Sequence, residues 1–405
     1  MMPVTSLGPI ALEQQFGAHN YHPLPVVLTR GEGVYLWDTE GKKYFDFLSA
    51  YSSVNMGHCH PRLVRVLQEQ AGRLAITSRA FYSDLLGPYE EFMTKRFGYD
   101  KLLPMNTGVE AFETAVKLCR RWGYDRKGIP ENKAIILVAE GGFHGRTIAA
   151  ISASNDPESR RGFGPYAPGF KLVPYNNVSS LESLAPDPNV AGFIVEPIQG
   201  EAGVIVPDGG YISKVAEICR QYNVLLIADE IQTGLGRTGR MLCSEYEGVR
   251  PDVLILGKAL GGGLLPVSAV LADDDVMLTI GPGEHGSTFG GNPLACAVAT
   301  EAIRVIDEEG LADNAFRLGE LFRTELRDIA SGDIVDVRGK GLLNAIQIRS
   351  EDPKAAWEIC LRLKDAGLLC KPTQGDKIRL APPLVITEEQ ILSAAGMLRS
   401  VLTGR

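Results

Sequence analysis

The sequence lacks the features of a membrane protein or a nucleic-acid-binding protein. Its 41 Lys and Arg residues are outnumbered by 49 Asp and Glu residues, giving a net charge of −8. A nucleic-acid-binding protein needs a basic face, so this balance argues against such a partner. The longest apolar runs, residues 134–139 and 224–228, are far shorter than the ~18 residues of a membrane span. We therefore expect neither a membrane nor a nucleic acid as partner.

The cysteines form no paired motif, and the N-terminus shows no targeting pattern. The seven cysteines form no CxxC pair, which favours reduced core residues over a disulfide framework. Residues 1–17 contain no Lys or Arg and include Glu13, unlike a mitochondrial transit peptide or a secretory signal. The sequence thus predicts a cytoplasmic protein.

Two short motifs invite a site and are better explained without one. His58, Cys59 and His60 are consecutive, but neighbouring side chains of an extended chain point to opposite faces, and zinc needs three or four converging ligands. Residues 234–239 fit GxGxxG, yet no clear helix follows and the position about 20 residues on is Lys258 rather than an acid. We expect no metal site and no dinucleotide site at these positions.

The alternation of apolar runs with helical patterns predicts an α/β fold. A chain of 405 residues exceeds the roughly 250–300 residues at which single cores stop growing. Residues 26–50 alternate apolar and polar positions, as in a small antiparallel meander within an N-terminal segment, 1–60. Residues 61–306 predict a large domain with a mostly parallel central sheet covered on both faces, and 307–405 a smaller α+β domain. The strands of the large domain are expected at 134–139, 192–195, 224–228 and 253–256, with helices at 108–122 and 211–221. Short strands at 334–337, 342–348 and 377–380 belong to the smaller domain.

Glycine is abundant: it makes up 45 of the 405 residues, about 11%, whereas its usual share is ~7%. The glycines cluster at 108, 141–145, 234–239, 257–263 and 281–291, nearly always directly after an expected strand. Ligands of open α/β sheets bind outside the carboxyl ends of the strands. This placement indicates a ligand site.

Three features at this edge suit pyridoxal phosphate. Asp229 and Lys258 end neighbouring expected strands, and Gly108 begins a helix whose free N–H groups suit a phosphate. Burial favours the neutral amine of a lysine, which is the form that makes a Schiff base, and an acid can pair with the pyridinium nitrogen. Because Glu230 adjoins Asp229 on a strand, only one of the two can face the site. For the stretch around Gly108 alone, an ordinary helix N-cap is an equal alternative, and the three features together leave a phosphosugar or nucleotide enzyme open.

Longer segments resemble a known family. Residues 225–239, 252–263 and 286–295 are similar to the class-III, pyridoxal-phosphate-dependent aminotransferases. Residues 17–28, 45–61, 103–111, 195–207 and 337–346 resemble the ornithine aminotransferase branch of that family. The resemblance runs from about residue 15 to the end. It implies the fold-type I architecture of pyridoxal-phosphate-dependent transferases and an obligate homodimer whose active site lies at the subunit interface.

The resemblance also assigns roles at the cofactor. Lys258 matches the lysine that binds the cofactor and moves the proton, and Asp229 matches the partner of the pyridine nitrogen. Phe143 matches the aromatic that stacks on the ring, and Gln232 the partner of the phenolic oxygen. Gly108 and Val109 match the positions whose N–H groups bind the phosphate, and Thr288 the residue that reaches it from the neighbouring subunit.

Substrate selection is assigned to a second set of residues. Tyr21 and Arg146 match positions that hold the α-amine and α-carboxylate of ornithine, and Tyr51 matches the position that separates these enzymes from γ-aminobutyrate aminotransferases. Arg379 matches the arginine that binds the α-carboxylate of 2-oxoglutarate, and Glu201 the glutamate that neutralises it while ornithine is bound. The alternative to these substrate-binding roles is that Tyr21 and Tyr51 are ordinary aromatic residues of the core.

The implied reaction transfers the δ-amino group of ornithine to 2-oxoglutarate by a ping-pong mechanism. Related aminotransferases of acetylornithine, γ-aminobutyrate or lysine remain the close alternatives, and an idle binding protein on the same fold is a distant one. Two positions depart from the family pattern. His144 stands where an aromatic often follows Phe143, and its interpretation as a packing residue is favoured over an extra hydrogen bond. Phe289 replaces a common tyrosine.

Overall fold

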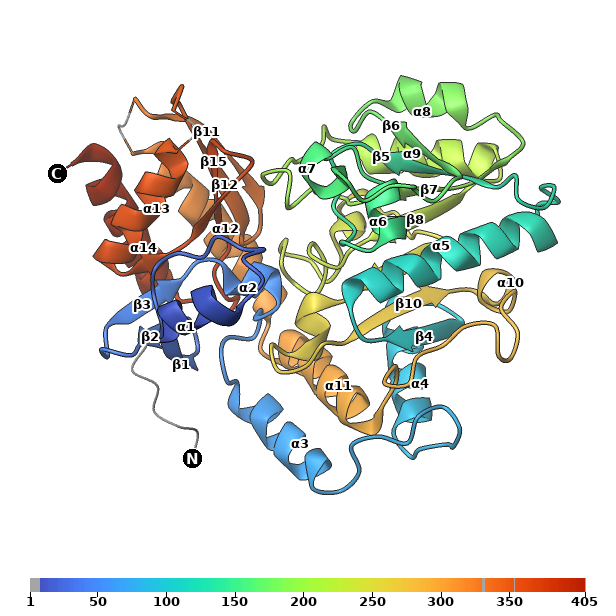
Figure 1. Cartoon of the computed structure of the whole chain (residues 1–405), viewed down its shortest axis with the longest axis horizontal. Helices are drawn as coiled ribbons and strands as arrows, with labels where there is room; N and C mark the ends of the chain where they lie inside the picture. The colour runs from blue at the N-terminus through green and yellow to red at the C-terminus, as the bar shows by residue number, and fades with distance from the viewer. Residues whose placement is uncertain (1–7, 330–331, 353, 405) are drawn as a thin grey trace.

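The computed structural model describes residues 8–329, 332–352 and 354–404. Its centre is a seven-stranded sheet in the order β4-β10-β9-β8-β7-β5-β6 (Figure 1). Strands β5 to β9 are mutually parallel, which confirms a largely parallel central sheet, whereas β10 runs antiparallel to both β4 and β9. The strands are β4 (Lys101–Met105), β5 (Ile135–Ala139), β6 (Phe170–Val173), β7 (Val190–Val195), β8 (Leu225–Asp229), β9 (Val253–Leu256) and β10 (Ser268–Ala272).

Both faces of this sheet are covered, as continuous apolar strands require. Along β5, Ile136 and Val138 pack with helix α5 (Gly108–Asp125), while Leu137 and Ala139 pack with helix α9 (Tyr211–Gln221) on the other face. Strand β9 and helix α9 begin and end where the sequence predicts them. The sheet therefore holds its carboxyl edge rigidly between two layers of helices.

A second sheet lies in the C-terminal part, in the order β11-β12-β15-β14. Helices α12 (Leu311–Arg327) and α13 (Ala355–Ala366) pack against this sheet, and α14 (Glu388–Thr403) packs against both helices. Its strands are β11 (Ile334–Lys340), β12 (Leu343–Ile348), β14 (Lys371–Thr373) and β15 (Lys377–Leu380). Strand β15, which carries Arg379, pairs with both β12 and β14, so the arginine sits on an inner strand.

The expected N-terminal meander is present as β1 (Leu28–Glu32), β2 (Tyr35–Asp38) and β3 (Lys43–Asp46), all antiparallel. Its edge strand β3 pairs in parallel with β13 (Leu368–Leu369), so the meander shares a sheet with the C-terminal part. Figure 1 shows the blue meander beside the red C-terminal helices, apart from the green and cyan large sheet.

The remaining helices connect these layers. Helix α11 (Pro293–Glu308) packs against α3 (Pro61–Ala71) and α4 (Leu86–Phe97) below the large sheet in Figure 1. None of the helices in the described part of the chain combines the length and apolar composition that a membrane span requires. The shorter elements are α1 (Pro9–Phe16), α2 (Ser49–Ser52), α6 (Ile148–Ser152), α7 (Pro157–Arg160), α8 (Val178–Leu184), α10 (Asp274–Met277), and two 3-10 helices, Cys243–Glu247 and Lys258–Gly261.

Candidate active site

Lys258 and Asp229 lie on neighbouring strands at the carboxyl edge of the large sheet. Asp229 is the last residue of β8 and pairs in register with Ile255 of β9, and Lys258 follows two residues after β9 ends. Their placement follows from two adjacent parallel strands, VLIL and LLIAD, in which every residue is buried. The sequence-based expectation that both residues reach one edge of the sheet is confirmed.

The Lys258 amine is placed for nucleophilic chemistry. Within the described residues it makes no hydrogen bond or ion pair. Burial lowers its pKa below the usual lysine value, and the nearby carboxylates of Glu201 and Asp229 offset only part of that effect. A lowered pKa increases the fraction of neutral amine, the form that attacks a carbonyl carbon.

A cavity of about 390 Å³ opens beside this lysine. The start of α5 forms another wall, where Thr107 caps the helix by accepting the N–H of Glu110, and the Glu110 carboxylate accepts the N–H of Thr107 in return. Gly108 lines the cavity directly after the cap, and Val109 follows it. A helix start with free N–H groups is suited to an anion, so this wall fits a phosphate group. The lining is completed by Ser53, Asn106, Thr107 and residues 263–267.

Asp229 is fixed by a histidine that the sequence analysis assigned to packing. His144 Nδ1 lies 2.7 Å from Asp229 Oδ2, and both side chains are almost fully buried. The imidazole also stacks on Phe112, with ring centroids 4.9 Å apart. The interpretation of His144 as packing alone is therefore wrong, because the ring both packs and hydrogen-bonds. Its partner is 85 residues away in sequence, and no local pattern indicates that pairing.

Glu230 faces away from this site, as the alternation of side chains along a strand predicts. It is fully buried and accepts hydrogen bonds from the Thr233 hydroxyl and from the N–H groups of Cys243 and Ser244. Burial raises the pKa of this carboxyl above its usual value. Glu230 thus anchors the loop after β8 and leaves Asp229 alone to face the cofactor side.

A further buried carboxylate, Glu196, was missed by the sequence analysis. It follows β7 and accepts hydrogen bonds from the Phe143 N–H at 2.8 Å and from the Gly200 N–H at 3.3 Å. Burial raises its pKa, and the charge of His144 works against that rise. Glu196 therefore holds the backbone of Phe143, the proposed stacking aromatic, in place.

Gln232, Glu201 and Arg379 form a connected polar group beside Lys258. Glu201 Oε1 accepts from Arg379 Nη1 at 2.5 Å and from Gln232 Nε2 at 3.0 Å. Burial would raise the pKa of Glu201, but the charge and hydrogen bond of Arg379 outweigh it and hold that pKa below its usual value. The Arg379 side chain is 3% exposed and that of Glu201 26% exposed, so a buried guanidinium is neutralised by a carboxylate nearer to solvent.

Tyr51 completes this group from an unusual backbone. The Arg379 guanidinium carbon lies 4.8 Å from the centre of the Tyr51 ring, close enough for a cation–π contact. Burial raises the pKa of the Tyr51 hydroxyl. Tyr51 lies in α2, whose residues have positive φ angles and therefore form a left-handed turn rather than an ordinary helix. The expected meander ends before this turn.

Of the assigned residues only Gly108 and Lys258 line the cavity of one chain, and three of the others, Tyr21, Arg146 and Thr288, are exposed. Tyr21 is 75% exposed, so its interpretation as a core aromatic is wrong. The Arg146 side chain is 64% exposed, lies 3.7 Å from Asp156, and has its guanidinium carbon 5.2 Å from the centre of the Phe143 ring. Thr288 is exposed in the loop before α11. Phe143 itself is half-buried.

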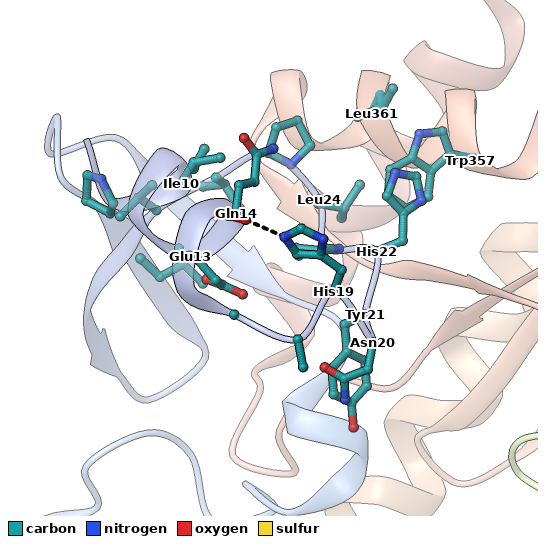
Figure 2. Close-up of a pocket in the computed structure, with 18 residues that line it drawn as sticks. Ile10, Glu13, Gln14, His19, Asn20, Tyr21, His22, Leu24, Trp357 and Leu361 are labelled. Atoms are coloured by element: carbon teal, nitrogen blue, oxygen red, sulfur yellow. Dashed lines mark hydrogen bonds between the residues drawn. The ribbon is translucent and has the colours of Figure 1, made fainter. Parts of the chain in front are cut away.

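Tyr21 belongs to a separate hollow formed by the N-terminal segment. That hollow, of about 1090 Å³, is lined by residues 9, 10, 13, 14 and 17–28 together with Trp357 and Leu361 of α13. Figure 2 shows His22 stacked on Trp357, at a ring distance of 4.3 Å, while Tyr21 points to the opposite side, toward α2. The segment is thus pinned to α13 at His22 and offers Tyr21 outward.

Known proteins resemble this chain over nearly its whole length. The family model of class-III aminotransferases matches residues 16–402. The chain is 62% identical over 392 residues to the mitochondrial ornithine aminotransferase of Drosophila melanogaster, covering 97% of this chain and 90% of that protein. The ornithine aminotransferase of Toxoplasma gondii, described with partial occupancy of pyridoxal phosphate at its active site, is 48% identical with a TM-score of 0.96, over 98% and 93% of the two chains. An acetylornithine aminotransferase of Elizabethkingia anophelis is 53% identical with a TM-score of 0.90, over 98% of each chain. The chain therefore belongs to the class-III aminotransferases.

Proposed function

We propose that this chain is a pyridoxal-phosphate-dependent ornithine aminotransferase. It transfers the δ-amino group of L-ornithine to 2-oxoglutarate and yields glutamate 5-semialdehyde and L-glutamate; the semialdehyde then cyclises to pyrroline-5-carboxylate. The observation that carries the proposal is the ion pair between Glu201 and Arg379 beside Lys258. A guanidinium that can be neutralised or freed suits a site that must accept first a diamino acid and then an oxo diacid.

The residues around Lys258 fit the cofactor. Two buried polar atoms, Gln232 Oε1 and His144 Nε2, have no hydrogen-bond partner in the described structure, so the site retains unused polar capacity. The cavity adjoins both the lysine and the start of α5. When bound, pyridoxal phosphate supplies an aldehyde that condenses with an amine and a ring that accepts the electrons of the breaking C–H bond.

The chain's own residues would divide the work as follows. Lys258 Nζ would hold the cofactor and move the proton, while the Asp229 carboxylate would accept the N–H of the ring nitrogen. Phe143 would pack against the ring, Gln232 would bind the phenolic oxygen, and the N–H groups of Gly108 and Val109 would bind the phosphate. The strongest support is at Lys258, where the lowered pKa favours the neutral amine that attacks a carbonyl carbon.

Substrate orientation falls to the second group of residues. Tyr21 and Arg146 hold the α-amine and α-carboxylate of ornithine, so that its δ-amine faces Lys258. Meanwhile Glu201 keeps Arg379 neutralised at 2.5 Å. When 2-oxoglutarate enters, Glu201 releases Arg379, which then binds the α-carboxylate. Tyr51 stacks with Arg379, so it lies beside the arginine that is neutralised for ornithine and free for 2-oxoglutarate.

Attachment at Lys258 can be tested without turnover. Holoenzyme is reduced with borohydride, digested and analysed by peptide mass spectrometry. We expect the reduced cofactor on the peptide that contains Lys258, and no labelled peptide in the Lys258→Ala variant. A label on another lysine would refute the assignment.

The substrate is tested by a panel of ornithine, acetylornithine, γ-aminobutyrate and lysine, each with 2-oxoglutarate. We expect ornithine to have the highest kcat/KM. The alternative with a specific observation behind it is acetylornithine, because a protein named for that substrate is 53% identical to this chain. A higher kcat/KM for acetylornithine would replace the proposal by that alternative.

We also propose that the active enzyme is a homodimer in which Thr288 reaches the phosphate of the partner's site. Thr288 is exposed beside Phe289, which is 57% exposed. Phe81 and Tyr82 are 75% and 103% exposed. They follow Ala75, whose carbonyl accepts the N–H of Leu294, shortly after Thr288 in the chain. Large apolar side chains so exposed on adjoining segments favour a covered surface.

Subunit complementation tests the shared site. Lys258→Ala and Thr288→Val homodimers should each be impaired, whereas a mixed dimer contains one site with both native residues. We expect mixing under exchange conditions to restore up to a quarter of the native activity by random pairing, and sedimentation to give a dimer. Impaired homodimers that show no restoration after confirmed exchange would contradict a shared site.

A cytoplasmic location remains a prediction. The Drosophila melanogaster relative is named as mitochondrial, so the location is not settled by kinship. Fractionation of cells that express the native gene would decide it, and activity confined to an organelle would contradict the prediction.

A further inference from the structure

The backbone that carries Tyr51 is strained. Ser49, Ala50, Tyr51 and Ser52 have φ angles of 49°, 45°, 60° and 70°. None of the four is glycine, and in this region the Cβ of an L-residue crowds the following carbonyl oxygen. Such residues normally occur singly, and a run persists only where the surroundings enforce it, most often at functional sites.

Asp46 caps the start of this turn. Its Oδ1 accepts the N–H groups of Leu48 and Ser49, both at 2.8 Å. The turn is closed internally by the Ser53 N–H, which donates to the Ser49 carbonyl at 2.8 Å. The Ser49 hydroxyl donates to the carbonyl of Ala381 at 2.7 Å, two residues beyond Arg379. The turn is therefore bonded to the strand end that presents the arginine.

Asp46 is itself held from the meander. Its other oxygen lies 2.7 Å from His58 Nε2, and the Asp46 side chain is only 4% exposed. The backbone of His58 exchanges two hydrogen bonds with Gly33. A Cβ at Gly31 would lie 2.9 Å from the His58 side chain, so the histidine fills the space that this glycine leaves.

These contacts form a continuous path to the substrate pocket. It runs from the meander through His58 and Asp46 to the left-handed turn, and from there to the Tyr51 ring against Arg379. A return of Tyr51 to negative φ would redirect its Cα–Cβ bond and remove the ring from the guanidinium. The position of the ring therefore depends on a turn that its own residue types disfavour.

We propose that Asp46 is a specificity-positioning residue, which holds Tyr51 against Arg379 by capping the left-handed turn and so maintains the preference for ornithine over γ-aminobutyrate. The inference rests on the proposed function. Among the described residues, Asp46 makes no hydrogen bond or ion pair with Tyr51 or Arg379, and its Oδ1 bonds only the backbone N–H groups of Leu48 and Ser49 at the start of the turn.

The test compares kcat/KM for ornithine and γ-aminobutyrate in four variants. Asp46→Ala should lower the ornithine value about tenfold, mainly through KM, and the γ-aminobutyrate value less than twofold. Adding Ala50→Gly to Asp46→Ala should restore about half of the lost preference, because glycine adopts positive φ without steric conflict at one of the four positions of the turn. Ala50→Gly alone should preserve the preference within about twofold.

Asp38→Ala is the matched control. Asp38 also caps a turn of the meander, accepting the N–H groups of Glu40 and Lys42, but it lies outside the path to Tyr51. It should leave the substrate preference unchanged. If Asp46→Ala does not fold alone, the double variant is compared with Ala50→Gly, and a clear loss of preference in the double variant is then expected.

Three results would overturn this inference without affecting the proposed function. The first is an unchanged preference in Asp46→Ala, or in the double variant where Asp46→Ala does not fold. The others are an equal loss of kcat/KM for both substrates, and a double variant that is neither better folded nor more selective than Asp46→Ala. A native enzyme without ornithine activity would overturn the proposed function as well. The two failures are therefore distinguishable by the native enzyme itself.

Discussion

His144 and Asp229 form a buried pair in which the imidazole Nδ1 lies 2.7 Å from the carboxylate Oδ2. Stacking on Phe112 fixes the plane of the imidazole, and the Ile231 N–H occupies the other carboxylate oxygen at 3.1 Å. Asp229 is thus oriented by two donors and needs no contribution from solvent. A carboxylate held by two hydrogen bonds has a fixed direction, which is what a partner of a protonated ring nitrogen requires.

Replacement of His144 by phenylalanine should weaken cofactor binding. The new ring can still stack on Phe112, but Asp229 loses a hydrogen bond to a charged group, worth about 1.5–3 kcal/mol. We expect the cofactor dissociation constant to rise about tenfold or more, measured by equilibrium dialysis against apoenzyme. His60→Phe is the control, because it removes another histidine–carboxylate pair, with Glu309, away from the site. Equal affinities in all three proteins would contradict the role of His144.

The same pair should make the stability of the apoenzyme depend on pH. Burial alone would lower the pKa of His144, but the hydrogen bond and charge of Asp229, aided by Glu196, raise this pKa above the usual histidine value of 6.5. Since the folded-state pKa is the higher one, the stabilisation is complete below about pH 6.5 and is lost as the pH rises through the folded-state value.

Thermal unfolding of apoenzyme from about pH 6 to 9 checks this sign. The difference in Tm between native protein and His144→Phe should be largest near pH 6 and should shrink as the pH rises. A loss of packing alone gives a difference that is constant with pH. A difference that grows with pH would show that His144 is neutral in the folded protein.

Glu201→Ala should separate the two half-reactions. Without the carboxylate, Arg379 stays free to bind an α-carboxylate, so the half-reaction with glutamate should keep its rate within about twofold. The half-reaction with ornithine should lose about tenfold in selectivity for the δ-amine over the α-amine. Stopped-flow absorbance of each half-reaction and analysis of the ornithine products measure both effects. Equal damage to the two half-reactions would exclude the proposed switch.

Local sequence is sufficient for the elements whose surroundings are uniform. Strand β9 is an uninterrupted apolar run, and helix α9 has a regular apolar face, so both were predicted to the residue. Strand β10 was missed although it is equally buried, and its antiparallel direction depends on its neighbours β4 and β9 rather than on its own residues.

The parts that sequence reasoning missed depend on contacts between distant segments. The left-handed turn at Ser49–Ser52 contains no glycine and is enforced by Asp46 and by the Ala381 carbonyl, 332 residues from Ser49. Arg237, in the glycine-rich loop after β8, is fully buried and bonds to Asn55, Leu342 and Pro382, which come from three separate segments. Spacing along the chain gives no sign of either arrangement.

Tyr51→Ile should shift the substrate preference toward γ-aminobutyrate. The Tyr51 ring lies 4.8 Å from the Arg379 guanidinium, and the proposed function places its hydroxyl near the ornithine α-substituents. An aliphatic side chain removes that polar group and uncovers the arginine, so we expect the ratio of kcat/KM for ornithine to that for γ-aminobutyrate to fall about tenfold. Tyr166→Ile removes another tyrosine that stacks with an arginine, Arg160 at 4.0 Å, and should leave the ratio unchanged. An unchanged ratio in Tyr51→Ile would move the origin of specificity away from this ring, to Tyr21 and Arg146.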